Sequence, residues 1–151
     1  DIYRPWLEEG FRRAGGGKTL SDLEIQPGVT VIVTDEIEQA FNRMKPSIAL
    51  YAGGMGHRDK NFHNDMMVRR GYPEAAQKIQ ELYLAGRKRE AIAAVPNEYC
   101  DEASLVGPPQ RIRDRYKEWE ASGATGLTLS CKQMEGLELL AELTGSRDRI
   151  A

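Results

Sequence analysis

Residues 28–34, GVTVIVT, are the stretch that decides the fold. Six β-branched residues follow one another directly after a Pro27-Gly28 boundary, and this composition predicts a β-strand. The run is nearly continuous in apolar character, which is typical of a strand covered on both faces. The sequence therefore predicts a buried strand of the kind found in parallel sheets.

A helix is predicted directly after this strand. Asp35 is the expected N-cap, and Glu38 stands three residues later, as in a capping box. The helix is expected to run towards Lys45, and Pro46 is expected to end or kink it. Residues 47–52 can form a further helical piece.

A second, shorter strand is predicted at residues 126–130, GLTLS. An amphipathic helix at 110–122 precedes it, and another at 133–143 follows it. The run VGPP at 106–109 indicates an interruption of regular structure. Other helices are predicted at 3–14, 61–70, 73–85 and 87–95, with a short piece around Cys100 and Ala103.

Two strands are too few for a sheet that is stable by itself. One interpretation is a mostly helical bundle with a small ribbon. The other is an α/β fold, the C-terminal portion of a (β/α)8 barrel with about two parallel strands and a helical insertion at residues 46–105. A complete barrel takes about 250 residues, and this chain has 151. On that interpretation residues 1–151 are a single segment of a barrel domain.

The composition excludes several classes of protein. The net charge of −2, with 29% charged and 40% apolar residues, indicates an ordered globular chain and gives no reason to expect a nucleic-acid partner. No apolar run approaches the roughly 20 residues that span a bilayer. Cys100 and Cys131 lack metal-site spacing and are expected to be reduced, as in a cytoplasmic protein. The chain opens on Asp1 without a methionine, so we expect a segment of something longer.

Six blocks of sequence resemble the luciferase-like oxidoreductases, most closely the bacterial branch that uses the deazaflavin coenzyme F420 in place of FMN. The blocks are YRPWLEEGF (3–11), VTVIVTDEIEQAF (29–41), KPSIALYAGGMG (45–56), NFHNDMMVRRGY (61–72), IQELYLAGRKREAIAAVP (79–96) and LVGPPQRIRDRYKEWEASGATGLTL (105–129). The stretches IALYAGGMG and LYLAGRKREA are the most specific of these. The last block is similar to the region that leads into the eighth strand throughout the superfamily.

The resemblance implies a (β/α)8 barrel in which residues 29–33 form the seventh strand and residues 127–129 the eighth. It implies hydride transfer between coenzyme F420 and a small organic substrate, with FMN as the alternative coenzyme. The family holds the deazaflavin ring mainly with the first half of the barrel. The catalytic residues are therefore expected outside this chain, and the expected partner is that N-terminal half or a second copy in a homo-oligomer.

The segment from Tyr51 to Tyr72 is the candidate substrate loop. Its glycines permit close approach of backbone to a ligand, although a structural turn explains them as well. The segment matches neither a P-loop nor a G-x-G-x-x-G fingerprint. Asn61 is also a natural N-cap, and Phe62 either anchors the helix or walls a substrate pocket. The predicted substrate-loop residues are Tyr51, Gly53, Gly54, Met55, Gly56, Asn61 and Phe62.

The loop after the predicted eighth strand supplies the coenzyme candidates. Barrels often place phosphate sites in the seventh and eighth βα loops, so Ser130 and Lys132 are predicted to bind the phosphate end of a coenzyme. A helix cap and a solvated lysine are the alternative. His57 and His63 lack zinc spacing and are open to an acid-base role or to a plain solvated one. The alternative function for the whole chain is a non-catalytic helical interaction module or an FMN-dependent monooxygenase fragment.

Overall fold

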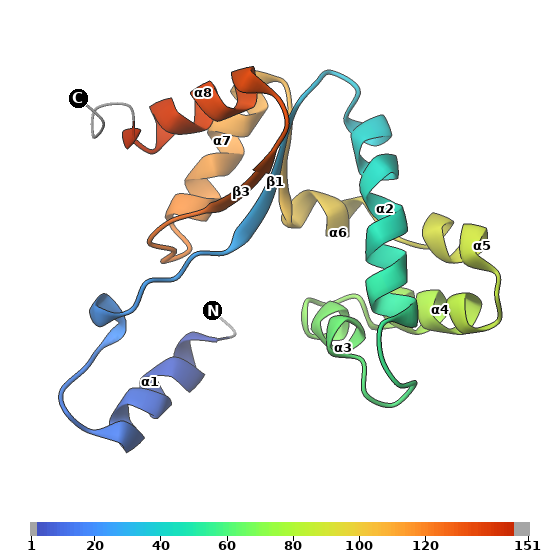
Figure 1. Ribbon diagram of the computed structural model, residues 1–151, viewed down its shortest axis with the longest axis horizontal. Helices are drawn as coiled ribbons and strands as arrows, with labels where there is room; N and C mark the ends of the chain where they lie inside the picture. The colour runs from blue at the N-terminus through green and yellow to red at the C-terminus, as the bar shows by residue number, and fades with distance from the viewer. Residues whose placement is uncertain (1–2, 147–151) are drawn as a thin grey trace. The chain divides into compact units, whose positions relative to one another are not determined.

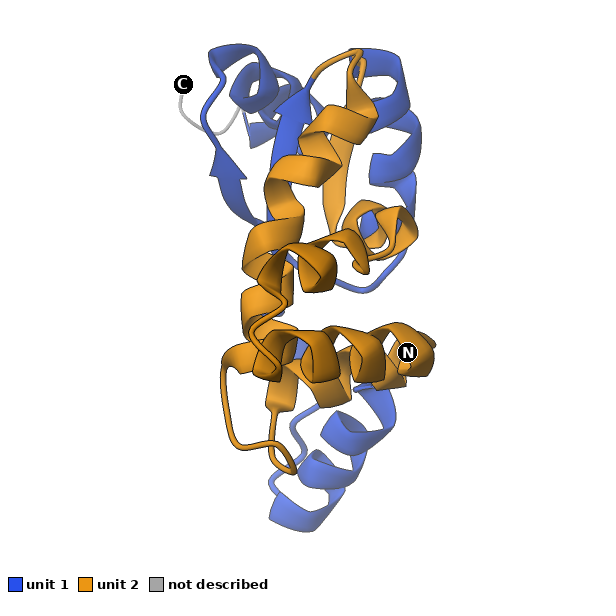
Figure 2. Ribbon diagram, turned by 90° about the vertical axis from the view of Figure 1, so that its right-hand side faces the viewer, with its two compact units in different colours: residues 1–33, 109–151 blue, residues 34–108 orange. Residues whose placement is uncertain are grey.

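The computed structural model describes residues 3–146 and divides the chain into two compact units (Figure 2). The first unit comprises residues 1–33 and 109–151, and the second comprises residues 34–108. The first unit contains α1 (Arg4–Ala14), a short 3-10 turn (Leu20–Asp22), β1 (Gly28–Val33), α7 (Pro109–Glu120), β3 (Thr128–Cys131) and α8 (Met134–Leu143) (Figure 1). The second unit contains α2 (Ile37–Gly54), α3 (Phe62–Arg69), α4 (Pro73–Leu84), α5 (Lys88–Ala93), α6 (Asn97–Glu102) and β2 (Ser104–Gly107). No helix within residues 3–146 is long and apolar enough to cross a membrane.

In the first unit, β1 and β3 pair in parallel. The register joins Gly28 to Thr128 and continues residue by residue to Val31 and Cys131. The prediction of two parallel strands, each followed by a helix, is confirmed here. The second strand begins two residues later than expected, at Thr128 rather than Gly126.

One face of the β1–β3 pair packs on α8. A Cβ atom built on Gly136 of α8 would lie 2.7 Å from Cys131 Sγ, 3.4 Å from Val31 Cγ1 and 3.7 Å from Val33 Cγ2. Only glycine fits this contact, which brings the start of α8 onto the strands. Since side chains alternate along a strand, Thr30 and Ser130 point to the opposite face.

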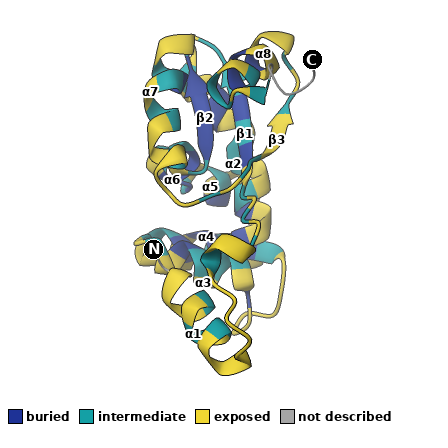
Figure 3. Cartoon of the chain, turned by 90° about the vertical axis from the view of Figure 1, so that its left-hand side faces the viewer, coloured by how far each residue is buried: buried dark blue, intermediate teal, exposed yellow. Residues whose placement is uncertain are grey.

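The expectation that the first strand is covered on both faces is wrong for the described residues. Val29 and Val31 are buried, whereas Thr30 and Ile32 on the other face are only half-buried. On β3, Thr128, Leu129 and Ser130 are exposed (Figure 3). Continuous apolar character along the strand therefore coincides with buried residues on one face, Val29 and Val31, and with half-buried residues on the other.

The chain has a third strand that the sequence did not predict, β2. All four of its residues are buried. Four residues are too few to show a period of two, and Gly107 at the end of the strand with Pro108 after it indicated only a break. Ser104, the first residue of the strand, donates its hydroxyl to the carbonyl of Cys100 at 2.7 Å, which satisfies a buried polar group.

The first helix of the second unit differs from prediction at both ends. Its N-cap is Glu36 rather than Asp35, because the hydroxyl of Thr34 accepts the Glu36 N–H at 3.0 Å and holds the turn before the helix. Pro46 lies inside α2, and the helix continues to Gly54. The expected end of the helix at Pro46 is therefore wrong, and a kink at this residue stays a prediction.

Gly53 and Gly54 close the last turn of α2, so they are helical and do not belong to a loop. A Cβ atom on Gly53 would lie 2.6 Å from Tyr83 Cβ and 3.2 Å from the Ile79 carbonyl oxygen. A Cβ atom on Gly54 would lie 2.4 Å from Tyr83 Cε1. The two glycines therefore let α2 approach α4 more closely than any larger residue would allow.

A four-residue polar cluster ties α3 and α4 to α6 in the second unit. Arg70 Nη2 lies 2.9 Å from Glu102 Oε2, and the Tyr72 hydroxyl donates to Glu102 Oε1 at 2.6 Å. The Arg70 guanidinium also lies 4.3 Å from the centre of the Tyr99 ring. Arg70 is therefore ion-paired through Glu102 and stacked on an aromatic ring.

We expect Gly53→Ala to destabilise the chain by about 1–3 kcal/mol, because the new methyl group meets the base of Tyr83 and a backbone carbonyl that cannot move aside. Gly10→Ala in α1 is the matched control, since nothing lies within 4 Å of its added Cβ. This control should stabilise by about 0.5–1 kcal/mol. Urea unfolding followed by circular dichroism measures both. Equal effects of the two substitutions would contradict the packing account.

Alkaline pH should weaken the cluster at Tyr72. The hydrogen bond to Glu102 and burial raise the pKa of Tyr72 to about 12, whereas an unfolded tyrosine has a pKa of about 10. The stabilising contribution is therefore complete below about pH 10 and is lost as the pH rises through 12. Absorbance titration of wild type against Tyr72→Phe should show one phenol with a midpoint near 12 in the difference curve. A midpoint near 10 would contradict the claim that Glu102 raises the pKa of Tyr72.

Candidate functional site

Ser130 and Lys132, the predicted coenzyme residues, lie at the carboxyl end of β3 and directly beyond it. Both are exposed. Thr30 of β1 is the register partner of Ser130, and both point away from α8. Two hydroxyl side chains therefore stand side by side on one face of the strand pair. Sequence analysis missed Thr30, because its place beside Ser130 follows only from the register.

The loop between β3 and α8 is anchored by the side chain of Gln133. Its Oε1 accepts the Val33 N–H at 2.8 Å, and its Nε2 donates to the Val33 carbonyl at 2.9 Å. The Cys131 thiol donates to the Gln133 carbonyl at 3.2 Å. Lys132 lies between these two anchored residues and forms no ion pair among the described residues. No local pattern indicates Gln133, because its partner lies 100 positions away.

This arrangement suits an anion. A lysine ammonium group binds phosphate as a point charge, and hydroxyl groups donate further hydrogen bonds to the same oxygens. It offers no acid-base pair and no nucleophile with a neighbouring base. The residues at this end of the strands can hold one end of a ligand, and their chemistry does not by itself supply a reaction.

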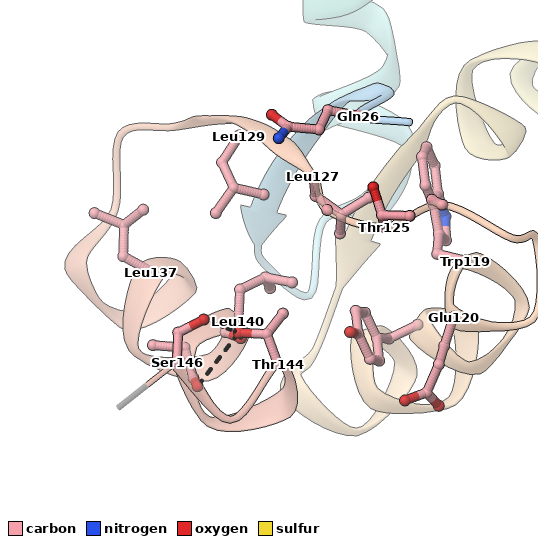
Figure 4. Close-up of a pocket in the computed structure, with 14 residues that line it drawn as sticks. Gln26, Trp119, Glu120, Thr125, Leu127, Leu129, Leu137, Leu140, Thr144 and Ser146 are labelled. Carbon is pink, nitrogen blue, oxygen red and sulfur yellow. Dashed lines mark hydrogen bonds between the residues drawn. The ribbon is translucent and has the colours of Figure 1, made fainter. Parts of the chain in front are cut away.

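A cavity of about 550 Å³ lies on the other face of β3. Leu129 of β3 and Leu137 and Leu140 of α8 form its apolar wall, with Trp119 of α7 nearby (Figure 4). The described residues that line it include no lysine or arginine. The lining of the cavity therefore differs in chemistry from the carboxyl end of β3, where hydroxyl and ammonium groups are exposed.

In the second unit, Asn61 joins two helices. Its side chain accepts the N–H groups of His63 and Asn64 at 3.0 and 3.2 Å, which confirms its prediction as the N-cap of α3. It also donates to the carbonyls of Tyr51 and Ala52, each at 3.0 Å, at the end of α2. Asn61 is 3% exposed. Asn61 is thus a buried residue that links the end of α2 to the start of α3.

Gly56 makes the turn between these helices. Its φ of 137° favours glycine, and an added Cβ would lie 2.8 Å from the Lys60 carbonyl oxygen. The turn is closed by the Lys60 N–H, which donates to the His57 carbonyl at 3.0 Å. Among the predicted substrate-loop residues, Gly53, Gly54, Gly56 and Asn61 therefore all have a structural reason to be present.

Tyr51, Met55 and Phe62 remain exposed, at 41%, 49% and 61%. The Tyr51 ring lies 4.7 Å from the His63 ring, and the Phe62 ring lies 5.5 Å from it on centroid distances. His57 lies 3.5 Å from Asp59 at the surface. No group of three or more potential metal ligands occurs in the described part of the chain. Tyr51, Met55 and Phe62 are therefore among the exposed side chains of the segment that another molecule can contact.

We expect Asn61→Ala to destabilise the second unit by about 1–3 kcal/mol, because it removes an N-cap and leaves the Tyr51 carbonyl without its side-chain donor, whereas Asn64 still donates to the Ala52 carbonyl. Asn61→Ser keeps a capping oxygen and loses the two donated hydrogen bonds without adding a buried charge, so it should cost less. Urea unfolding compares the variants. An Asn61→Ala variant as stable as wild type would refute the linking role.

Comparisons with known proteins give a family, a similar sequence and a similar fold. The sequence model of the luciferase-like monooxygenase family matches residues 3–126. A protein of Mycobacterium tuberculosis described as a "putative coenzyme F420-dependent oxidoreductase" is 38% identical over 142 residues, which are 94% of this chain and 41% of that protein. The solved structure of the coenzyme F420-dependent tetrahydromethanopterin reductase of Methanopyrus kandleri is similar with a TM-score of 0.64 and 20% identity, over 93% of this chain and 40% of that one. The chain thus spans about two fifths of the length of both relatives.

Proposed function

Because the chain belongs to the luciferase-like monooxygenase family, we propose that it is the C-terminal part of a barrel oxidoreductase that transfers hydride between coenzyme F420 and a small organic substrate. Both similar proteins described above are named for this coenzyme. The observation that carries the proposal is the parallel pair β1 and β3, with Ser130 and Lys132 at the carboxyl end. In β/α barrels that end carries the active site.

Ser130 and Lys132 would hold the anionic end of the coenzyme. Lys132 provides a positive charge without a competing carboxylate among the described residues, and Ser130 and Thr30 provide hydroxyl donors on one face. Coenzyme F420, when bound, supplies the hydride chemistry. The residues of this chain would bind the anionic end of the coenzyme and fix its position.

The predicted substrate segment divides into supporting and contacting residues. Gly53, Gly54, Gly56 and Asn61 give the segment its shape through the contacts described above. Tyr51, Met55 and Phe62 are exposed apolar side chains, and we propose that they contact the apolar part of the substrate. Aromatic side chains suit this role because they provide a large, rigid contact area.

A complete site needs more strands than the three found within residues 3–146. Exposed residues on β3 leave it open to a further strand. We propose that an N-terminal barrel segment or a second copy of the chain supplies the rest of the site, including the surface for the coenzyme ring. A cytoplasmic location and a homo-oligomer belong to the same proposal.

Optical titration of the purified chain with coenzyme F420, with FMN as comparison, tests the proposal. We expect saturable binding of coenzyme F420 and an increase in Kd of about tenfold in Lys132→Ala, the size of a lost charged hydrogen bond. Lys18→Ala removes another exposed lysine of the first unit and should change nothing. Phe62→Ala should leave the coenzyme Kd within about twofold, while weakening substrate binding in turnover assays with the complete barrel.

Three results would count against the proposal. Equal binding of FMN would contradict the choice of coenzyme. Binding that Lys132→Ala does not alter would contradict the assigned residues. A compact monomer that binds neither coenzyme would favour the non-catalytic helical module, since an incomplete barrel exposes apolar surface and tends to self-associate.

A further inference from the structure

We propose that Gln133 is a positioning residue, whose side-chain amide takes the place of a further strand residue beside Val33 and thereby fixes Lys132 at the carboxyl end of β3. The expected effect of Gln133 on coenzyme binding rests on the proposed function, since Lys132 is the proposed anion-binding group. The geometric part concerns only the first unit.

The strand register leads directly to this position. Each β1 residue pairs with the β3 residue 100 positions later, from Gly28 with Thr128 to Val31 with Cys131. The same offset would place residue 133 beside Val33. The β3 strand ends at Cys131, however, and α8 begins at Met134. The backbone therefore leaves the ladder before it reaches Val33.

Gln133 fills the gap with its side chain. In a parallel ladder, a residue bonds to its neighbouring strand through both its N–H and its carbonyl. Val33 has both groups satisfied by one amide, at 2.8 Å and 2.9 Å. Among side chains of this length, only the glutamine amide is both an acceptor and an N–H donor. A hydrocarbon side chain of the same length would leave both groups of Val33 unpaired.

The residues on both sides of Lys132 are held in place. Before it, Cys131 packs against Gly136 and donates its thiol to the Gln133 carbonyl. After it, Gln133 is bonded to Val33. The backbone of Lys132 therefore has little freedom, while its side chain stays exposed. Binding an anion then costs less conformational entropy than it would on a mobile loop.

The test uses Gln133→Met in the whole chain, since methionine has similar length and bonds to neither Val33 group. Gln77→Met, at an exposed position of α4, is the matched control. Two readouts need no ligand. Exchange of the Val33 amide should accelerate about tenfold, as for one lost hydrogen bond. The NMR order parameter of the Lys132 amide should fall from about 0.85 towards 0.6.

The third readout is the coenzyme F420 titration in a double-mutant cycle with Lys132→Ala. A residue that acts through Lys132 should raise the coenzyme Kd about fivefold in the wild-type background and leave it unchanged in the Lys132→Ala background. A purely structural defect would weaken binding in both backgrounds.

The outcomes separate the inference from the proposed function. If wild type binds no coenzyme F420, the proposed function fails, and the amide exchange and order parameter still decide whether Gln133 positions Lys132. If wild type binds and the cycle is additive, the inference fails while the proposed function stands. Val33 exchange within twofold of wild type, or an unchanged Lys132 order parameter, also overturns the inference. Far-UV circular dichroism confirms that each variant is folded.

Discussion

The parallel pairing of β1 with β3 is the constraint on which the rest of the first unit depends. It joins residues 100 positions apart, and parallel strands require a crossover connection between them. Once the register is set, Thr30 and Ser130 share one face, while Val31 and Cys131 share the face that receives α8. The identity of residue 136 then matters, because anything larger than glycine would push α8 away from the strands. Position, face and exposure of the candidate coenzyme residues all follow from this single pairing.

The sequence predicted those elements whose local pattern agrees with their final environment. The strand at 28–33 has a run of β-branched residues, and the helices at 109–120 and 134–143 repeat apolar positions at helical spacing. Pro46 shows where local rules fail. A proline inside a helix costs about 3 kcal/mol or more, yet Ala49 and Ala52 beyond it are fully buried in the second unit. Tertiary packing offsets the local cost, and a rule based on neighbouring residues cannot include it.

The candidate site was predictable to the extent that its residues act locally. Asn61 was identified as an N-cap because the capping pattern spans only three residues. Gly53 and Gly54 were assigned to a loop. In the sequence, a glycine that makes room for the Tyr83 side chain cannot be told from a glycine that makes room for a ligand. Thr30 and Gln133 were missed because each depends on a partner far along the chain. Register, which no local pattern encodes, separates the residues that were found from those that were not.

A cation at the end of a strand can hold a ligand by one end, but it cannot orient a ring. Orientation requires at least a second surface, and on the described face of β1 and β3 the side chains are short hydroxyls and Ile32. The chain also spans about two fifths of its relatives. These two facts separate the role of this segment from the role of the other strands. If this segment binds the charged end of a coenzyme, its contribution is affinity and placement, and the chemistry at the ring depends on residues that other strands provide. Rigid placement of Lys132 is then the property that this segment must preserve, which explains why a hydrogen-bonded side-chain amide, rather than an open loop, ends the strand.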